Sequence, residues 1–286
     1  MSRATRLLAV VDREVATVIR TRAYAVVAVG YAAIVLGLGL QGGGGFVPLT
    51  VDLLTPVELL VPPVATAFGY RAVIADTEGK EIEALRSYPL SRSSYVLGVY
   101  LGRLAAVMVV VVTPLLLVGL LVPGTAGQGS SVVASHETAG SVLLYLRFVV
   151  LSAVFAAVVL ATAVAVSTVA RTGRTALALA VALVVVLVIG ADLGIVAALA
   201  GGLVRDQGLA LLIAASPASA FRGLVLGSVV SVVASETVRA GSALANIVGL
   251  GTWLVGSLAV GVVTVWPTVG EFAWQVVDPA ADEPDD

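Results

Sequence analysis

Residues 76–98, DTEGKEIEALRSYPLSRSSYVLG, form a charged, helix-prone stretch between two long apolar runs. The whole chain is 59% hydrophobic and only 12% charged, so this stretch differs sharply from its surroundings. A water-facing segment in so apolar a protein is the place where a soluble partner would make contact. We therefore interpret this stretch as a water-exposed contact element between membrane-embedded helices.

The composition places the chain in a lipid bilayer. A mean hydropathy of +1.07 over 286 residues exceeds what a soluble core can bury. Each spanning helix needs roughly 20 apolar residues to cross a hydrocarbon core of ~30 Å, so about six spans fit, without a second soluble domain. The chain has no cysteine and a single histidine, His136. Disulfides, thiolate metal sites and a cysteine nucleophile are therefore excluded.

Six apolar runs predict six transmembrane helices, and hence an all-α polytopic membrane protein with one domain over residues 1–286. The predicted spans are residues 23–41, 51–70, 95–122, 142–168, 175–201 and 243–266. Residues 5–21 are predicted to form an amphipathic helix in the membrane interface. Its apolar side comprises Leu7, Leu8, Val11, Val15, Val18 and Ile19, and its polar side Arg6, Asp12, Arg13 and Arg20.

Lysine and arginine are unevenly distributed among the predicted loops. Eleven lie in the segment up to Arg22, the 71–94 loop and the 171–174 turn, against four in the opposite loops. Because these residues are enriched in cytoplasmic loops, the first set is predicted to face the cytoplasm. Both termini, including the acidic tail at 278–286, are then expected in the cytoplasm of a multi-pass plasma-membrane protein.

Residues 202–241 are the least regular part of the pattern. The run 209–235 is apolar enough to be a seventh span, which stays open as an alternative. Ser216 followed by Pro217 is typical of a helix N-cap with proline at the first helical position. We therefore expect a re-entrant or surface-lying pair of helices on the outer side, before the last span.

Small residues recur at four-residue spacing in three predicted spans, and such spacing lets helix backbones approach closely. They are Gly98 and Gly102, Gly190 and Gly194, and the row Ala153, Ala157, Ala161 and Ala165. Because the chain contains 30 glycines, some of these glycine pairs are expected by chance. Only the alanine row exceeds what the composition produces.

Within the polar stretch, Asp76 or Thr77 is expected to cap a short helix with Glu78 in its first turn. Pro89 ends this helix, because it disfavours helical geometry at the preceding residue. Ser91 is then expected to cap the third span. The apolar face of the short helix comprises Ile82, Leu85 and Tyr88, and its flanks carry Glu81, Glu83 and Arg86.

The segment GKEIEALRSYPLSRSSYVLG, residues 79–98, resembles the permease subunits of the ABC-2 superfamily of ATP-driven transporters. Those subunits have an acidic stretch, a leucine-containing helix, a P-[LV]-S-R turn and a Tyr-x-x-Gly start to the third span. The N-terminal helix with Glu14 and the SPASAFR segment at 216–222 resemble the family as well. Within it, the chain is most similar to the permease of the copper-related transporters of nitrous-oxide-reductase maturation.

The resemblance implies a homodimer or heterodimer of six-span permease subunits, each bound to a soluble ATPase that holds the ATP and Mg²⁺. The chain itself lacks a phosphate-binding loop of the form GxxxxGK[ST]. Lys80 follows Gly79, but the residue five positions before Gly79 is not a glycine. We expect a non-enzymatic permease subunit that couples ATP hydrolysis to substrate export. The expected ATPase contacts, all in the 71–94 loop, are Glu78, Glu81, Ile82, Glu83, Leu85, Arg86 and Tyr88.

Three charged residues fall within predicted spans, where an uncompensated charge costs about 2.5–3.5 kcal/mol. Prolines on both sides of Glu58 favour a kinked or broken helix that faces a cavity. Glu58 and Asp192 are candidates for the translocation path, although either could simply reach the interface. Arg103 is expected to extend toward the cytoplasmic headgroups.

An ion-driven secondary transporter, or another membrane transport component without an ATPase, is the alternative. It would need paired acids near the bilayer midplane and an inverted repeat, whereas the acids here are isolated. An intramembrane enzyme would need a cluster of catalytic groups that this composition does not supply. No metal or cofactor site is expected in the chain, and no basic stripe with interleaved aromatic residues predicts binding to nucleic acid.

Overall fold

The computed structural model describes residues 3–41, 45–79, 91–125, 142–201, 213–230 and 242–265, which are helical with short turns and contain no strand. The α-helices are α1 (Arg3–Arg20), α2 (Arg22–Gln41), α3 (Phe46–Gly69), α4 (Ile74–Glu78), α6 (Arg92–Thr125), α7 (Val142–Val169), α8 (Gly173–Val185), α9 (Ala191–Ala200), α11 (Pro217–Val225) and α13 (Ala243–Thr264). Two π-helical segments, η2 (Val186–Gly190) and η3 (Leu226–Val230), extend α8 and α11.

Six helical stretches in the described residues are long and apolar enough to cross a membrane. They are Arg22–Gln41, Phe46–Glu78, Arg92–Leu121, Val142–Val169, Gly173–Gly190 and Ala243–Thr264. Each overlaps one predicted span, so the prediction of an all-α polytopic membrane protein is confirmed.

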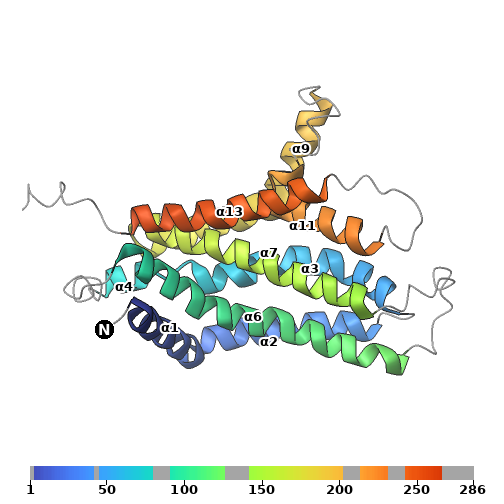
Figure 1. Cartoon of the computed structure of the whole chain (residues 1–286), viewed down its shortest axis with the longest axis horizontal. Coiled ribbons are helices and arrows are strands. Elements are labelled where there is room, and N and C mark those ends of the chain that lie inside the picture. The colour runs from blue at the N-terminus through green and yellow to red at the C-terminus, as the bar shows by residue number, and fades with distance from the viewer. Residues whose placement is uncertain are drawn as a thin grey trace, which may run out of the picture.

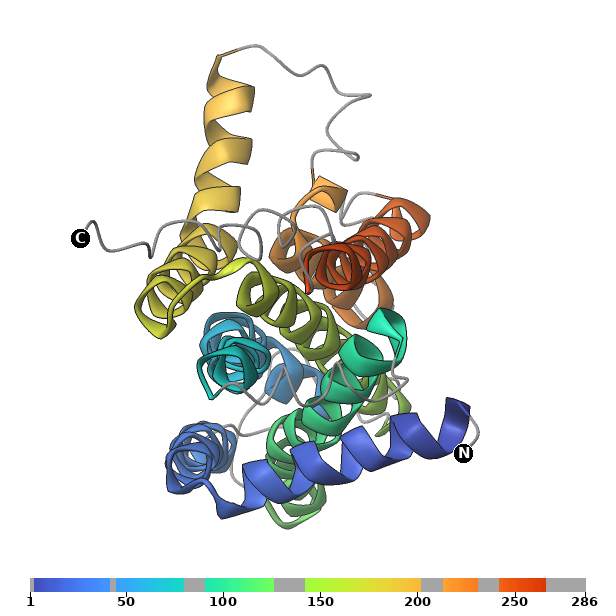
Figure 2. The same cartoon turned by 90° about the vertical axis from the view of Figure 1, so that its left-hand side faces the viewer.

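Helix α7 lies at the centre of the bundle, with α3, α6 and α13 packed around it (Figures 1 and 2). In the most apolar 18-residue stretch of α7, 67% of the residues are buried, whereas only 11% are buried in the corresponding stretch of α13. Phe148 and Phe155 of α7 are fully buried, and Phe155 stacks on Phe221 of α11 with ring centroids 4.9 Å apart. The peripheral helices thus direct much of their apolar surface outward, as membrane helices do.

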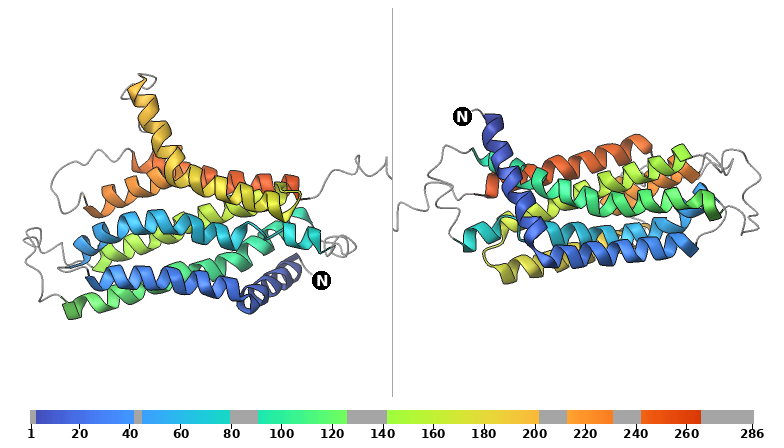
Figure 3. Two further views of the ribbon diagram at one scale, coloured as in Figure 1. Left: turned by 180° about the vertical axis from the view of Figure 1, so that it is seen from behind. Right: turned by 90° about the horizontal axis from the view of Figure 1, so that it is seen from below.

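Helix α1 lies across one end of the bundle, on α6 (Figures 2 and 3). The first glycine pair permits this contact. A Cβ at Gly98 would lie 2.7 Å from the Val10 Cβ, and one at Gly102 would lie 2.6 Å from the Glu14 Cβ. A Cβ at Gly194, in contrast, would meet no atom within 4 Å. The first pair therefore packs against α1, whereas Gly194 makes no close approach.

The buried face of α1 differs from the predicted apolar side. Val10, Glu14 and Val18 face the bundle, whereas Leu8 and Ile19 are 57% and 78% exposed. The difference arises because the buried Arg103 of α6 lies at this face and requires an acidic partner, which Glu14 supplies. The outward apolar residues remain available to a membrane interface.

The predicted fifth span, residues 175–201, is wrong in its second half. The helix passes from α8 through the π-helical segment η2 and then leaves the bundle as α9 (Figure 1). A π-turn interrupts regular helical hydrogen bonding and is a common cause of helix bending. The membrane-length helix therefore covers Gly173–Gly190, and Asp192 lies beyond it in the first turn of α9.

The second span is continuous, so of the kinked or broken helix expected near Glu58, the broken alternative is wrong. Pro56, Pro62 and Pro63 all lie inside the uninterrupted helix α3. Prolines are tolerated in a membrane helix when its neighbours hold it in place. Most of α3 is buried, and it packs against α7 and α2.

The cap at Ser216 is confirmed, because the Ser216 Oγ accepts a hydrogen bond from the Ser219 N–H and Pro217 begins α11. Almost all of α11 is buried against α7 and α13, which excludes a surface-lying helix there. From Pro217 to Val230 the helix is about 21 Å long, shorter than a hydrocarbon core of ~30 Å. The described part of residues 202–241 thus fits a re-entrant helix and provides no seventh span.

Candidate functional site at the α4 end of the bundle

The base of the polar loop is attached to the bundle through α4. The backbone N–H groups of Val73 and Ile74 both donate to the Ser167 Oγ of α7, at 2.9 and 3.1 Å. This serine satisfies two N–H groups at the start of α4, which otherwise lack helical partners. Asp76 and Thr77 lie inside α4 and do not cap it; the short helix that they were expected to cap lies outside the described residues.

Asp76 instead joins α4 to two other helices. Its Oδ2 accepts a hydrogen bond from the Tyr95 hydroxyl of α6 at 2.6 Å and one from Arg13 Nη2 of α1 at 2.5 Å. Asp76 is buried, so these charge-assisted bonds are stronger than they would be in water. Asp76 was not among the predicted contact residues, since the sequence does not show that Arg13 and Tyr95 meet it.

Arg103 is buried rather than extended to the headgroups, so that expectation is wrong. It is only 3% exposed, and its Nε donates to the Glu14 Oε2 at 2.8 Å. Its Nη1 donates to the Tyr24 hydroxyl at 2.9 Å and to the Phe68 carbonyl oxygen. Helix α1 covers this face of α6 and supplies the opposite charge, which removes the need to reach water.

Arg13 links the contacts around Asp76 with those around Arg103 and Glu14. Its Nη2 donates to the Glu14 Oε1 at 2.8 Å as well as to Asp76. Partial burial acts to lower the pKa of Arg13, but its bonds to Asp76 and the charges of Asp76 and Glu14 raise the pKa above its ordinary value. Arg13 therefore remains a cation. We call Arg13, Glu14, Asp76, Tyr95 and Arg103 the charge network; it contains two cations and two carboxylates.

Glu78, at the end of α4, connects the loop to α8. Its Oε1 accepts a hydrogen bond from the Gly173 N–H at 2.6 Å, and its Oε2 lies 3.3 Å from Arg71 Nη2. A carboxylate is favoured at this position because the α8 N-terminus is the positive end of the helix dipole. Among the predicted ATPase contacts, Glu78 alone is described. Glu81, Ile82, Glu83, Leu85, Arg86 and Tyr88 lie outside the described residues.

Glu58, a candidate for the translocation path, forms a two-bond ion pair with Arg222 of α11. Arg222 Nε lies 2.9 Å from the Glu58 Oε2, and Nη2 lies 2.7 Å from Oε1. Glu58 is 8% exposed, so the pair compensates a largely buried charge and fastens the re-entrant helix to α3. Asp192 belongs to α9, and its side chain lies outside the described residues.

The fold and these contacts together define a class of protein. It is a multi-pass α-helical membrane protein, with a buried charge network joining a lateral helix, the spans and the base of a polar loop. In the described residues, no three acidic, histidine or cysteine side chains gather as a possible metal site.

Comparison with known proteins gives the family. The model of the ABC-2 family transporter protein matches residues 8–265, so the chain belongs to this family of membrane transport components. A segment of 83 residues is 35% identical to the probable ABC transporter permease protein NosY of Stutzerimonas stutzeri. This segment covers 28% of the chain and 29% of that protein, well under two thirds of the relative. The predicted family is confirmed, and the match agrees with the predicted subgroup.

Proposed function

We propose that the chain is the membrane-spanning subunit of an ABC exporter, driven by ATP hydrolysis on a separate soluble ATPase. Family membership supports this proposal, as does the similarity to NosY, a probable ABC transporter permease protein. The functional unit would contain two permease subunits, identical or different. The α4 end of the bundle would face the cytoplasm, where the ATPase binds.

The attachment of the loop base carries the proposal. Force applied to the 71–94 loop would reach α1 and α6 through Asp76, α7 through Ser167, and α8 through Glu78. These bonds join α1, α6, α7 and α8 to the five-residue helix α4. A movement of the loop would therefore displace these helices as well. Isolated loops that move independently of the bundle could not do this.

Leu85→Asp should abolish binding of the ATPase without preventing membrane insertion. A charge in the proposed apolar contact face would have to be desolvated in the ATPase groove, which strongly disfavours binding. The measurement is co-purification of an ATP-hydrolysing subunit with the tagged full-length chain, extracted from its native membranes in mild detergent. Leu85→Met is the control, since it retains an apolar side chain of similar volume. The proposal fails if no such subunit accompanies the unmodified chain, or if Leu85→Asp retains it.

The proposed orientation can be tested separately, because the chain has no cysteine of its own. A single cysteine at Ser87 should react with a membrane-impermeant maleimide in inside-out vesicles but not in intact cells. A cysteine at Ser130, in the connection between α6 and α7, should show the opposite behaviour. Labelling of the Ser87 cysteine from outside would place the loop on the wrong side for a cytoplasmic ATPase.

A further inference from the structure

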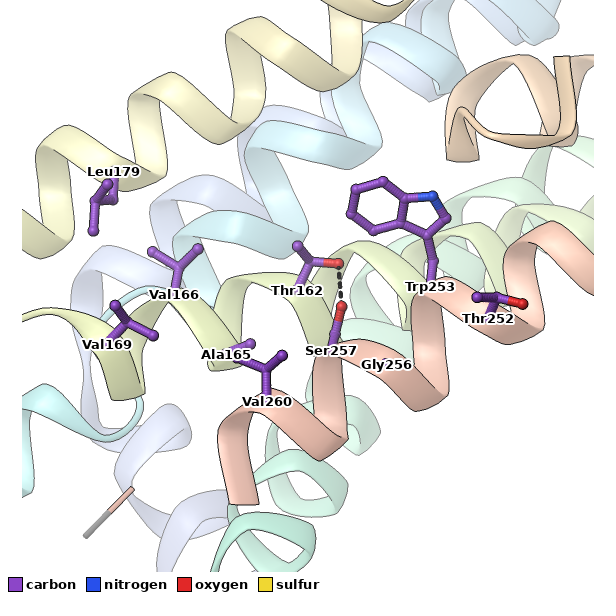
Figure 4. A pocket seen from close by; sticks show the side chains of 10 residues that line it. All are labelled: Thr162, Ala165, Val166, Val169, Leu179, Thr252, Trp253, Gly256, Ser257 and Val260. Carbon is purple, nitrogen blue, oxygen red and sulfur yellow. Dashed lines mark hydrogen bonds between the residues drawn. The ribbon is translucent and has the colours of Figure 1, made fainter. Parts of the chain in front are cut away.

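A cavity of about 460 Å³ lies between α7, α8 and α13 (Figure 4). Its walls are almost entirely apolar and include Val169 of α7, Leu179 of α8, and Trp253 and Gly256 of α13. Gly256 contributes to the space, because a Cβ there would meet no atom within 4 Å. The volume falls in the range typical of ligand pockets. Nothing in the proposed transport function uses this cavity.

The polar side chains of the lining are satisfied by the protein itself. The hydroxyls of Thr162 and Ser257 lie 3.1 Å apart and bond to each other (Figure 4). The Thr252 hydroxyl donates to the Val248 carbonyl at 2.8 Å, and the Trp253 indole N–H donates to the Ala215 carbonyl at 2.9 Å. Water is retained in a cavity by polar groups in need of partners. A molecule that fills this cavity would therefore have to be apolar.

The lining on α13 runs from Thr252 to Val260, about 12 Å along the helix axis. Trp253 is the eleventh of the 22 residues of α13, about 16 Å from the end of the helix at Thr264. Half of a hydrocarbon core is about 15 Å. Trp253 lines the cavity and lies in the middle of α13, so it marks the inner end of the cavity, at the depth of the bilayer centre.

The opposite end of the cavity points to the headgroup level. It lies beside Val169, the last residue of α7, and the exposed Arg171 and Arg174 follow within five positions. Arginine side chains near helix ends reach the lipid headgroups. The cavity thus runs from the headgroups at the α4 end of the bundle to the midplane.

We propose that this cavity binds one acyl chain of a phospholipid from the leaflet at the α4 end. A volume of about 460 Å³ admits a single hydrocarbon chain. The exposed cations Arg171 and Arg174, beside the outer end of the cavity, suit the phosphate of the lipid to which such a chain belongs. The site is independent of coupling to an ATPase.

Fluorescence quenching of Trp253 tests the site. Trp266→Phe and Trp274→Phe leave Trp253 as the single tryptophan among the three in the chain. Delipidated full-length protein in detergent is titrated with phosphatidylcholine that is brominated near the chain end or near the headgroup. Quenching should be saturable, and it should be stronger for bromines near the chain end, because Trp253 lies at the deep end of the cavity.

Gly256→Phe, made in the same background, should remove the saturable quenching, because the ring fills the cavity. Gly251→Phe is the matched control: a Cβ there also meets no atom within 4 Å, and Gly251 does not line the cavity. Native mass spectrometry should show one retained phospholipid per chain in the parent and in Gly251→Phe, and none in Gly256→Phe. Unsaturable quenching that is equal in all three proteins would overturn the proposal, as would an absence of quenching because a second copy covers the cavity.

Discussion

Glu14→Gln should lower the free energy of unfolding by about 3–5 kcal/mol, the usual cost of removing one partner from a buried ion pair. Arg103 would lose its carboxylate partner, Glu14, while remaining 3% exposed. A guanidinium stays protonated in proteins, so Arg103 cannot avoid this cost by losing its charge. The Tyr24 hydroxyl and the Phe68 carbonyl would still accept its hydrogen bonds but would not neutralise its charge. The measurement is chemical or thermal unfolding of the purified protein in detergent.

Three variants separate charge loss from other effects of the substitution. Asp12→Asn removes an acidic charge from the exposed side of the same helix and should leave the unfolding midpoint unchanged. Arg103→Met should cost less than Glu14→Gln, since Glu14 retains Arg13 at 2.8 Å. The double variant Glu14→Gln with Arg103→Met should recover part of the loss, because no unpaired cation remains. Equal midpoints for Glu14→Gln and Asp12→Asn would show that the pair contributes nothing.

Gly249→Ala should destabilise the contact between α13 and the start of the re-entrant helix. A Cβ at Gly249 would lie 3.0 Å from the Ala214 carbonyl carbon and closer still to its oxygen. These are backbone atoms of a segment fixed by the Ser216 cap and by the bond from Trp253 to Ala215. The segment cannot rotate aside, so α13 must move outward. Overpacking of this kind costs about 1–3 kcal/mol.

Gly251→Ala provides the control two residues away in the same helix. A Cβ at Gly251 meets nothing within 4 Å, so the substitution should stabilise the helix by about 0.5–1 kcal/mol. The two alanine variants should therefore shift the unfolding temperature in opposite directions. Equal shifts would mean that the close approach between Gly249 and Ala214 does not form in the folded protein.

Local patterns predicted the elements of this fold because their causes are local. The length of an apolar run fixes where a membrane helix lies, and a serine followed by proline fixed the start of α11 at Pro217. The Ser91 cap is also confirmed, since its Oγ accepts a hydrogen bond from the Ser94 N–H at 3.2 Å. Two predictions about the spans were wrong in part: the fifth span ends where α8 passes into η2, and α3 is not broken at its prolines.

The candidate site was predicted only in part because its residues are far apart in the chain. Glu14 and Arg103 are separated by 89 positions, Arg13 and Asp76 by 63, and Glu58 and Arg222 by 164. Sequence spacing indicates which residues share a face of one helix, but it does not identify the facing helix. From the sequence alone, Arg103 was therefore expected to reach the headgroups. In the structure, a carboxylate of α1 compensates its charge instead.

The sequence by itself determined the class of the protein, the number of its spans, and the polar loop that interrupts them, because hydrophobicity and chain length act residue by residue. Only the tertiary structure decided which charges compensate one another, where α1 lies, and where the lipid-sized cavity forms. These features depend on the shapes of surfaces brought together by folding, which no single segment contains.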